Sequence, residues 1–377
     1  MMKYLLIFLT TLLFASPLNL LNNYRAQVGL NPLKENRYLD VAAQKHAYFM
    51  YKNNAIGHYE AIGYPYFFGN TPFDRAIKAG YPTRQVVENI SHGEENFNES
   101  IRDLFSAIYH RIGFLDFNID EIGYAKISNF YVYDMGNSVI ANSCKNPSYA
   151  RSGYIGMCKN RNTIISKKTY NYLISKNPKV VLWPYPNMQN TPTVFYNEIP
   201  DPLPNIDVSG YPISILFNPY YYKHIKLIDF KIDNMTYKII TKNNDVNHKL
   251  KYNQFVLFPL KRLDYDKTYY IHAKFLVDGK IKVFNWKFHT EKTNNILEVT
   301  QINQTFYIKP NIKYSIYFKP QNKKDVITGF RYRYPSTLKI KDIAFKDANT
   351  IYLKVSGYGK ITLYTNNKRV NLIIKDK

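Results

Sequence analysis

Three residues in the N-terminal part of the chain could do chemistry together. His58 lies in a Gly-His-Tyr-Glu sequence, Glu88 in Val-Glu-Asn-Ile and His110 in Tyr-His-Arg. We expect each at or just beyond the end of a regular element, where a folded scaffold can present a side chain to a cleft. Two imidazoles and a carboxylate can ligate zinc or a similar divalent ion, and they can also transfer protons near neutral pH. The spacing alone leaves these roles open, beside the plainer alternative of capping or surface residues.

Helical patterns surround these three residues. Apolar residues at helical spacing predict a helix around residues 39–50. A threonine, a proline, an aspartate and a closing glycine predict a second helix over residues 71–80. A third helix is predicted to begin at Asn98 and to end with His110. Residues 121–133, rich in Ile, Tyr and Val, are predicted to form a strand.

Several ordered blocks in this region resemble the CAP superfamily in its SCP-like, bacterial form. The blocks lie at residues 21–33, 39–50, 74–81, 88–90, 104–115 and 122–125. The resemblance implies an α-β-α sandwich. It also implies one cleft lined by two histidines and two acids, and in several members of the family the histidines hold a divalent metal.

By motif, His58 and His110 correspond to the two histidines of the family, and Glu88 to the acid of its Glu-Asn motif. The resemblance therefore implies that His58 and His110 ligate Zn2+ or another divalent cation. The second acid of the family usually lies on the helix before the last histidine. Residues 104–108 read Leu-Phe-Ser-Ala-Ile, so no acid stands there. The set of four is incomplete or rearranged, which puts a stereotyped catalytic site in doubt.

Glu60 and Asp103 are the nearby acids that could replace the missing one. We favour Glu60, because Asp103 does not share a helix face with His110. The predicted cleft thus contains both histidines with Glu60 and Glu88, and these two glutamates are the candidate catalytic residues. His92 could face the same cleft or be a loop residue, and His46 is predicted to be a core histidine with its polar atoms satisfied.

The N-terminus and the cysteines indicate export. A basic start, an apolar run at residues 5–14 and small residues after it predict a signal peptide over residues 1–15, with an uncleaved anchor as the alternative. No later segment is apolar enough to span a bilayer. Cys144 and Cys158 are predicted to form a local disulfide in an oxidising compartment, with a free pair as the alternative. A secreted, periplasmic or cell-surface location follows.

Proline-rich stretches lie at residues 183–186 and 200–204. The helical sequence patterns end there, and only strand-like patterns follow. Residues 263–269 resemble the approach to a tyrosine corner of immunoglobulin-like domains. The predicted fold is α+β: a CAP α-β-α sandwich, then one immunoglobulin-like β-sandwich and a second small all-β domain. The predicted boundaries are 16–186 for the CAP domain, 187–204 for a linker, 205–292 for the sandwich and 297–377 for the last domain.

The formal net charge of +23 could attract anionic polymers. Lysines are scattered through strand-like segments without an arginine cluster, so we expect no nucleic-acid partner. We expect a partner in the cell envelope, a lipid or a protein. The predicted function is a ligand-, lipid- or metal-binding module. A metal-dependent peptidase or esterase is the alternative, and a structural envelope protein with a vestigial cleft is the second alternative.

Overall fold

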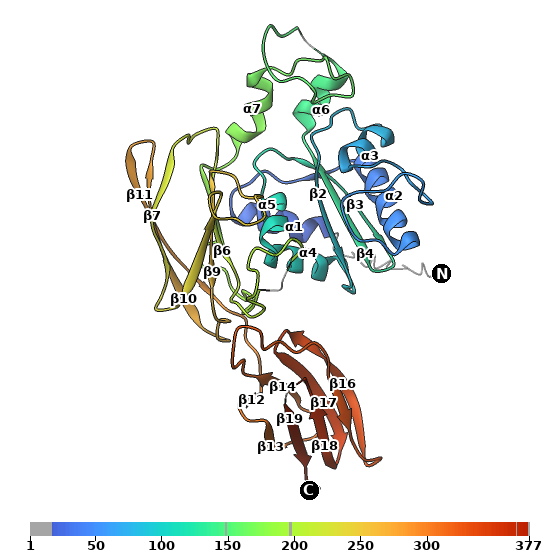
Figure 1. Cartoon of the computed structure of the whole chain (residues 1–377), viewed down its shortest axis with the longest axis vertical. Coiled ribbons are helices and arrows are strands. Elements are labelled where there is room, and N and C mark those ends of the chain that lie inside the picture. The colour runs from blue at the N-terminus through green and yellow to red at the C-terminus, as the bar shows by residue number, and fades with distance from the viewer. Residues whose placement is uncertain (1–16, 148, 196–197, 367, 376–377) are drawn as a thin grey trace, which may run out of the picture. The chain divides into compact units, whose positions relative to one another are not determined.

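The computed structural model describes residues 17–147, 149–195, 198–366 and 368–375, and the predicted signal peptide lies outside them (Figure 1). The chain forms two compact units. The first unit comprises Met1–Arg102 and Asp116–Leu173, and the second comprises Asp103–Leu115 and Ile174–Lys377. Within the described ranges, no helix is long and apolar enough to cross a membrane.

A four-stranded sheet with the order β1-β3-β4-β2 lies at the centre of the first unit. Its strands are β1 (Lys34–Glu35), β3 (Glu121–Ile127), β4 (Phe130–Gly136) and β2 (Val87–His92). The prediction of one strand over residues 121–133 is wrong, because β3 and β4 form an antiparallel hairpin there. Ser128 takes a positive φ of 55° between them, so the polar Ser-Asn pair makes a turn.

Helix α2 (Arg37–Asn53) covers one face of this sheet. Its N-terminus is capped by Asn36, whose side chain accepts hydrogen bonds from the backbone N–H of Tyr38 and Leu39. The apolar face of the helix packs on alternate residues of the strands. The buried residues of this contact are Ala43, Ala47, Phe49, Met50, Ile90, Ala125, Phe130 and Val132.

Helices also cover the opposite face of the sheet, as Figure 1 shows. The ring of Phe97 packs edge-on against Tyr131 and Tyr133, which alternate with Val132 and therefore point away from α2. Ser100 Oγ lies 2.8 Å from the hydroxyl of Tyr133. The α-β-α arrangement predicted for this domain is confirmed.

The helix predicted over residues 71–80 is α3 (Pro72–Ala79), closed by Gly80 in a left-handed conformation. Thr71 and Asp74 form the expected capping box. The third predicted helix is two helices, α4 (Phe97–Ser106) and α5 (Ile108–Phe114).

The predicted course of that third helix is wrong at both ends. The side chain of Asn96, not Asn98, accepts the N–H of Glu99 at 3.1 Å. Ala107 has an extended backbone (ψ 118°), which ends the α-helical path. His110 therefore lies inside a separate short helix.

A disulfide joins Cys144 to Cys158, the pair considered from the sequence. Cys144 lies on α6 (Ser138–Lys145), and the second cysteine lies in the loop before α7 (Lys167–Lys176). Cys158 also forms an isolated β-bridge with Thr83. The loop is thereby attached to the segment that leads into β2.

The second unit contains two pairs of sheets, so the later part of the chain is β-rich, as predicted. The first pair has the orders β5-β6-β9-β8 and β11-β10-β7. Its strands are β5 (Val180–Trp183), β6 (Ile213–Phe217), β9 (Gln254–Pro259), β8 (Tyr237–Thr241), β11 (Lys280–His289), β10 (Thr268–Val277) and β7 (Ile225–Ile232). The rings of Phe217 and Phe255 pack on Phe275 of the facing sheet. The hydroxyl of Tyr269 accepts the N–H of Asp264 at 2.8 Å, as at a tyrosine corner.

Two predicted boundaries differ from this arrangement. Strand β5 pairs with β6, so the end of the segment expected in the CAP domain is part of the second unit. The segment expected as a free linker also lies against the strands, because Thr191 N–H donates to His289 and Phe195 N–H to Ser209. Both contacts come from backbone pairing, which composition does not indicate.

The last two sheets share one core and have the orders β12-β14-β17-β16 and β13-β19-β18-β15. Leu353 and Leu372, one from each sheet, lie in that core. The strands are β12 (Ile296–Val299), β13 (Asn303–Ile308), β14 (Lys313–Phe318), β15 (Arg331–Arg333), β16 (Leu338–Asp347), β17 (Thr350–Gly357), β18 (Gly359–Tyr364) and β19 (Arg369–Ile374).

Gly123 makes the close approach of β3 to α2 possible. A Cβ at this position would lie 2.0 Å from the backbone N of Asp40 and 2.0 Å from the carbonyl carbon of Leu39. We expect Gly123→Ala to lower the free energy of unfolding by about 3 kcal/mol or more, because strand and helix must separate. Urea unfolding measures this change. Gly329→Ala is the control, since a Cβ there meets nothing within 4 Å; equal stability of the two variants would contradict the prediction.

Candidate functional site

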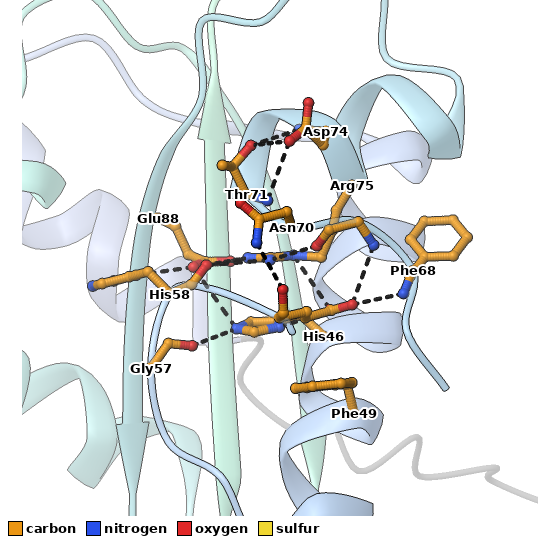
Figure 2. Close-up of polar contacts among 12 residues, drawn as sticks. His46, Phe49, Gly57, His58, Phe68, Asn70, Thr71, Asp74, Arg75 and Glu88 are labelled. Atoms are coloured by element: carbon orange, nitrogen blue, oxygen red, sulfur yellow. Dashed lines mark hydrogen bonds and ion pairs between the residues drawn. The ribbon is translucent and has the colours of Figure 1, made fainter. Parts of the chain in front are cut away.

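The structure brings His58 and Glu88 together. Nδ1 of His58 lies 2.9 Å from Oε1 of Glu88 (Figure 2). The histidine side chain is 39% exposed and the glutamate side chain 1% exposed. The pair therefore links the surface of the first unit to a buried carboxylate on β2.

Arg75 of α3 anchors this pair from behind, and the sequence analysis did not single it out. Its Nη2 donates to Oε2 of Glu88 at 2.6 Å, and both terminal nitrogens donate to the backbone carbonyl of His58 at 3.2 Å. The guanidinium is fully buried. The only sequence signal is an arginine within the first turns of an amphipathic helix, in a block that contributed to the CAP resemblance.

Glu60, the predicted replacement for the missing acid, points into the interior. Its side chain is fully buried, and its Oε2 accepts hydrogen bonds from the N–H groups of Phe68 (2.6 Å) and Gly69 (3.1 Å). Its Oε1 lies 2.9 Å from Nδ1 of His46. Glu60 thus holds the loop between α2 and α3 in place.

His46 is buried and both of its ring nitrogens are paired, as expected for a core histidine. Nδ1 faces the carboxylate of Glu60, and Nε2 lies 2.9 Å from the carbonyl oxygen of Gly57. An ionised carboxylate and a carbonyl can only accept hydrogen bonds. Nε2 of His46 therefore donates to the carbonyl of Gly57, and Nδ1 shares a proton with the carboxyl group of Glu60.

Asp134 of β4 completes the buried set, and the sequence analysis missed it too. It is the direct cross-strand neighbour of Glu88. It is fully buried, and its side chain interacts with the carboxylate of Glu88 beside it. Burial, and then the negative charge of Glu88, raise the pKa of Asp134 well above its ordinary value, so this carboxyl holds its proton.

The pKa of Glu88 shifts in the opposite direction, below its ordinary value. Burial alone would raise the pKa of Glu88, but the positive charges of His46 and Arg75 and the hydrogen bond from His58 lower it to about 2. Two basic side chains, His46 and Arg75, thus face two acidic side chains, Glu60 and Glu88, in the interior. Such balance is what makes a buried set of charges tolerable.

His110 lies in the second unit, on α5. Its Nδ1 is 3.1 Å from Oε2 of Glu198, and the same carboxylate accepts the N–H of Ile108 at 2.5 Å and of Tyr109 at 3.1 Å. Glu198 thus caps the helix and orients the histidine. Because His58 and His110 belong to different units, the shared metal ion implied by the resemblance stays a prediction.

The predicted metal ligands of the first unit differ in whether their surroundings suit a metal ion. Among the described residues, no group of three or more His, Cys, Asp or Glu side chains is arranged to hold a metal ion. Glu60 and Glu88 do not fit as ligands, since a buried guanidinium lies beside both. His58 does fit, because a histidine that donates Nδ1–H to a carboxylate offers Nε2 to a metal.

His92 lies outside this network. It is exposed and packs on the ring of Phe130. It lies four positions after Glu88 on β2, which is about 13 Å along the strand.

The fold and this site define the class of the first domain. Residues 18–138 match the model of the CAP, cysteine-rich secretory protein family. This part of the chain is therefore a CAP domain. No curated protein matches the sequence.

Solved structures show likenesses to parts of the chain. An extracellular protein containing an SCP domain from Bacillus anthracis is 20% identical (TM-score 0.30), over 32% of this chain and 39% of that protein. An outer surface protein from Borrelia burgdorferi is 20% identical (TM-score 0.28), over 31% of this chain and 86% of that one. InvD from Yersinia pseudotuberculosis is 8% identical (TM-score 0.19), over 45% of this chain and 54% of that one. This chain spans less than half of the Bacillus protein's length.

The two cross-strand carboxyl groups, Glu88 and Asp134, should respond differently when each is replaced by its amide. Glu88→Gln leaves Arg75 buried with too little negative charge, so we expect the free energy of unfolding at pH 7 to fall by about 3–5 kcal/mol. Asp134→Asn imitates the protonated carboxyl, and we expect stability within about 1 kcal/mol of wild type or above it. Urea unfolding of both variants measures the contrast, and equal losses would refute the charge assignment.

Acid should weaken the first unit through Glu88. The pKa of this carboxyl is lowered from 4.5 to about 2 in the folded protein, so the unfolded chain takes up the proton first. The contribution of Glu88 to the free energy of unfolding is therefore fully present above about pH 4.5 and is lost as the pH falls toward 2. This contribution is on the order of 3 kcal/mol. Unfolding free energies measured across this range should show that decline, and Glu88→Gln should lack this part of it.

Proposed function

We propose that this chain is an exported protein whose CAP domain is a binding module of the cell envelope or extracellular space, with His58 as its contact residue. Ligand binding, and not hydrolysis, is the function that the geometry supports best. The proposal rests on the buried positions of Glu60 and Glu88, whose carboxylates are bonded to other groups of the protein.

Export is supported by the disulfide and by the N-terminal sequence. A disulfide between Cys144 and Cys158 persists in oxidising compartments and is rare in the cytosol. The apolar run at residues 5–14 has the length and flanks of a secretory signal.

The carboxylates favour binding over catalysis. A general base works best when its pKa lies near the operating pH, and the pKa of Glu88 is about 2. Glu60 is fully buried and accepts two backbone N–H bonds besides its contact with His46. Neither glutamate can activate a water molecule at the surface, so the hydrolase that the sequence suggested loses both of its candidate bases.

His58 is well suited to contact a ligand. Its backbone is held by Arg75 and its ring by Glu88, so little conformational entropy is lost when the exposed edge binds. That exposed edge can contact a hydrogen-bonding ligand, or a divalent ion whose other ligands come from elsewhere. The same 2.9 Å pair supports a second candidate, a hydrolase in which Glu88 orients His58 as the base.

Zinc titration and a substrate library separate the two functions. We expect the full-length protein to bind Zn2+ in calorimetry without hydrolysing peptides or esters above the uncatalysed rate. In His58→Ala the zinc affinity should fall at least about tenfold, equivalent to ~1.4 kcal/mol. His92→Ala should keep the wild-type affinity. It also removes an exposed histidine, but His92 lies at the end of β2, outside the network of His58 and Glu88.

Turnover decides between the candidates. Hydrolysis that is abolished by His58→Ala and kept in His92→Ala would overturn the binding proposal and favour the hydrolase. Zinc binding that is equal in all three proteins would remove His58 from the site.

A further inference from the structure

A groove of about 720 Å3 lies in the second unit, on the outer face of the sheet β11-β10-β7. The strand register sets Lys231, His272 and Asn285 side by side across the three strands, and Tyr270 beside Lys287 in the next row. Alternate residues of these strands, such as Ile271, are buried in the core beneath. The groove is therefore built from the outward side chains of a regular sheet.

Side chains that both donate and accept hydrogen bonds line this groove. Lys231 and Lys287 are donors, Asp233 is an acceptor, and the amide of Asn285 is both. Oδ1 of Asn285 lies 2.7 Å from Nδ1 of His272, so its amide NH2 still has donors to offer. This mixture matches vicinal hydroxyl groups, each of which donates and accepts.

The charges in the groove nearly cancel, although the protein as a whole is strongly basic. Lys231 is paired with Asp229 at 2.8 Å. Lys287 stands in the same groove as Asp233. A polyanion would gain little from such a set, whereas an uncharged polar ligand loses no charge solvation on entering it.

Tyr270 supplies a flat apolar surface in the middle of these polar groups. Its side chain is on the outer face and the residue is 58% exposed, with Nζ of Lys287 6.0 Å from the ring centre. The backbone of Tyr270 is fixed by two hydrogen bonds with Asp233. A rigid aromatic ring flanked by amides and charges suits a pyranose, which has an apolar C–H face and a polar rim.

The wall of the groove is also fixed in place. Asn187 donates its backbone N–H to the carbonyl of Lys287 at 2.7 Å, and Nε1 of Trp286 donates to the carbonyl of Pro184. The loop that follows β5 is thus attached to the edge strand β11. A preformed groove binds without the cost of ordering its walls.

We propose that this groove binds an uncharged oligosaccharide, with one pyranose ring stacked on Tyr270 and its hydroxyls bonded to Asn285, Lys287 and Asp233. The site lies wholly in the second unit, so it is independent of the function proposed for His58. It gives the β-rich region a role in attaching the protein to neutral surface glycans.

Calorimetry of the full-length protein with four neutral tetrasaccharides tests this proposal: cellotetraose, chitotetraose, maltotetraose and mannotetraose. We expect at least one to bind, with an affinity that changes little between about 0.15 M and about 1 M salt. Tyr270→Ala should reduce that affinity by about tenfold or more, and Tyr270→Phe, which keeps the ring, should stay within about twofold of wild type.

Tyr307→Ala is the matched control. Tyr307 is a 67% exposed strand tyrosine with Nζ of Lys375 5.0 Å from its ring, but it lies in the last β domain. Its loss should leave glycan affinity unchanged. The proposal is overturned if none of the four sugars binds, if Tyr270→Ala binds as well as wild type, or if only dextran sulfate binds and salt abolishes that binding.

Discussion

The guanidinium of Arg75 is the group on which the first unit depends. It reaches from α3 to Glu88 on β2, to Glu60 in the preceding loop and to the backbone of His58. One buried cation thereby ties a helix, a strand and a long loop together. Because no water can replace it inside the protein, each of these elements takes the position that the guanidinium allows.

The chemistry presented at the surface follows from this buried charge. Arg75 and His46 keep Glu88 ionised, and an ionised Glu88 fixes the proton of His58 on Nδ1. The proton on Asp134 removes the repulsion that a second anion beside Glu88 would cause. An exposed histidine is in this way prepared by groups that no ligand can reach. Rigidity and charge state, more than the identity of the nearest acid, set what His58 can do.

Local features of the sequence predicted local structure well. The capping box of α3 and the strand-rich pattern after the prolines could be read from residue types and spacing. The pairing of His58 with Glu88 was indicated by the resemblance to the CAP family and not by spacing alone. Contacts across long separations could not. Asp134 meets Glu88 only through the register of β2 and β4, and Glu198 reaches His110 across 88 residues. The sequence suggested Glu60 as a residue of the cleft, whereas its carboxylate lies in the interior and accepts two backbone N–H bonds.

The path of the chain between the two units has a further consequence for its resistance to proteases. The backbone passes between the two units at Arg102/Asp103, Leu115/Asp116 and Leu173/Ile174. A protease that cuts one of these crossings does not release either unit as a free fragment, because the pieces of the divided unit remain packed together. The β1-β3 and β2-β4 pairings hold the first unit in this way, and the Glu198 cap on α5 helps to hold the second. The interleaved chain therefore tolerates a nick that would separate domains joined by a single linker.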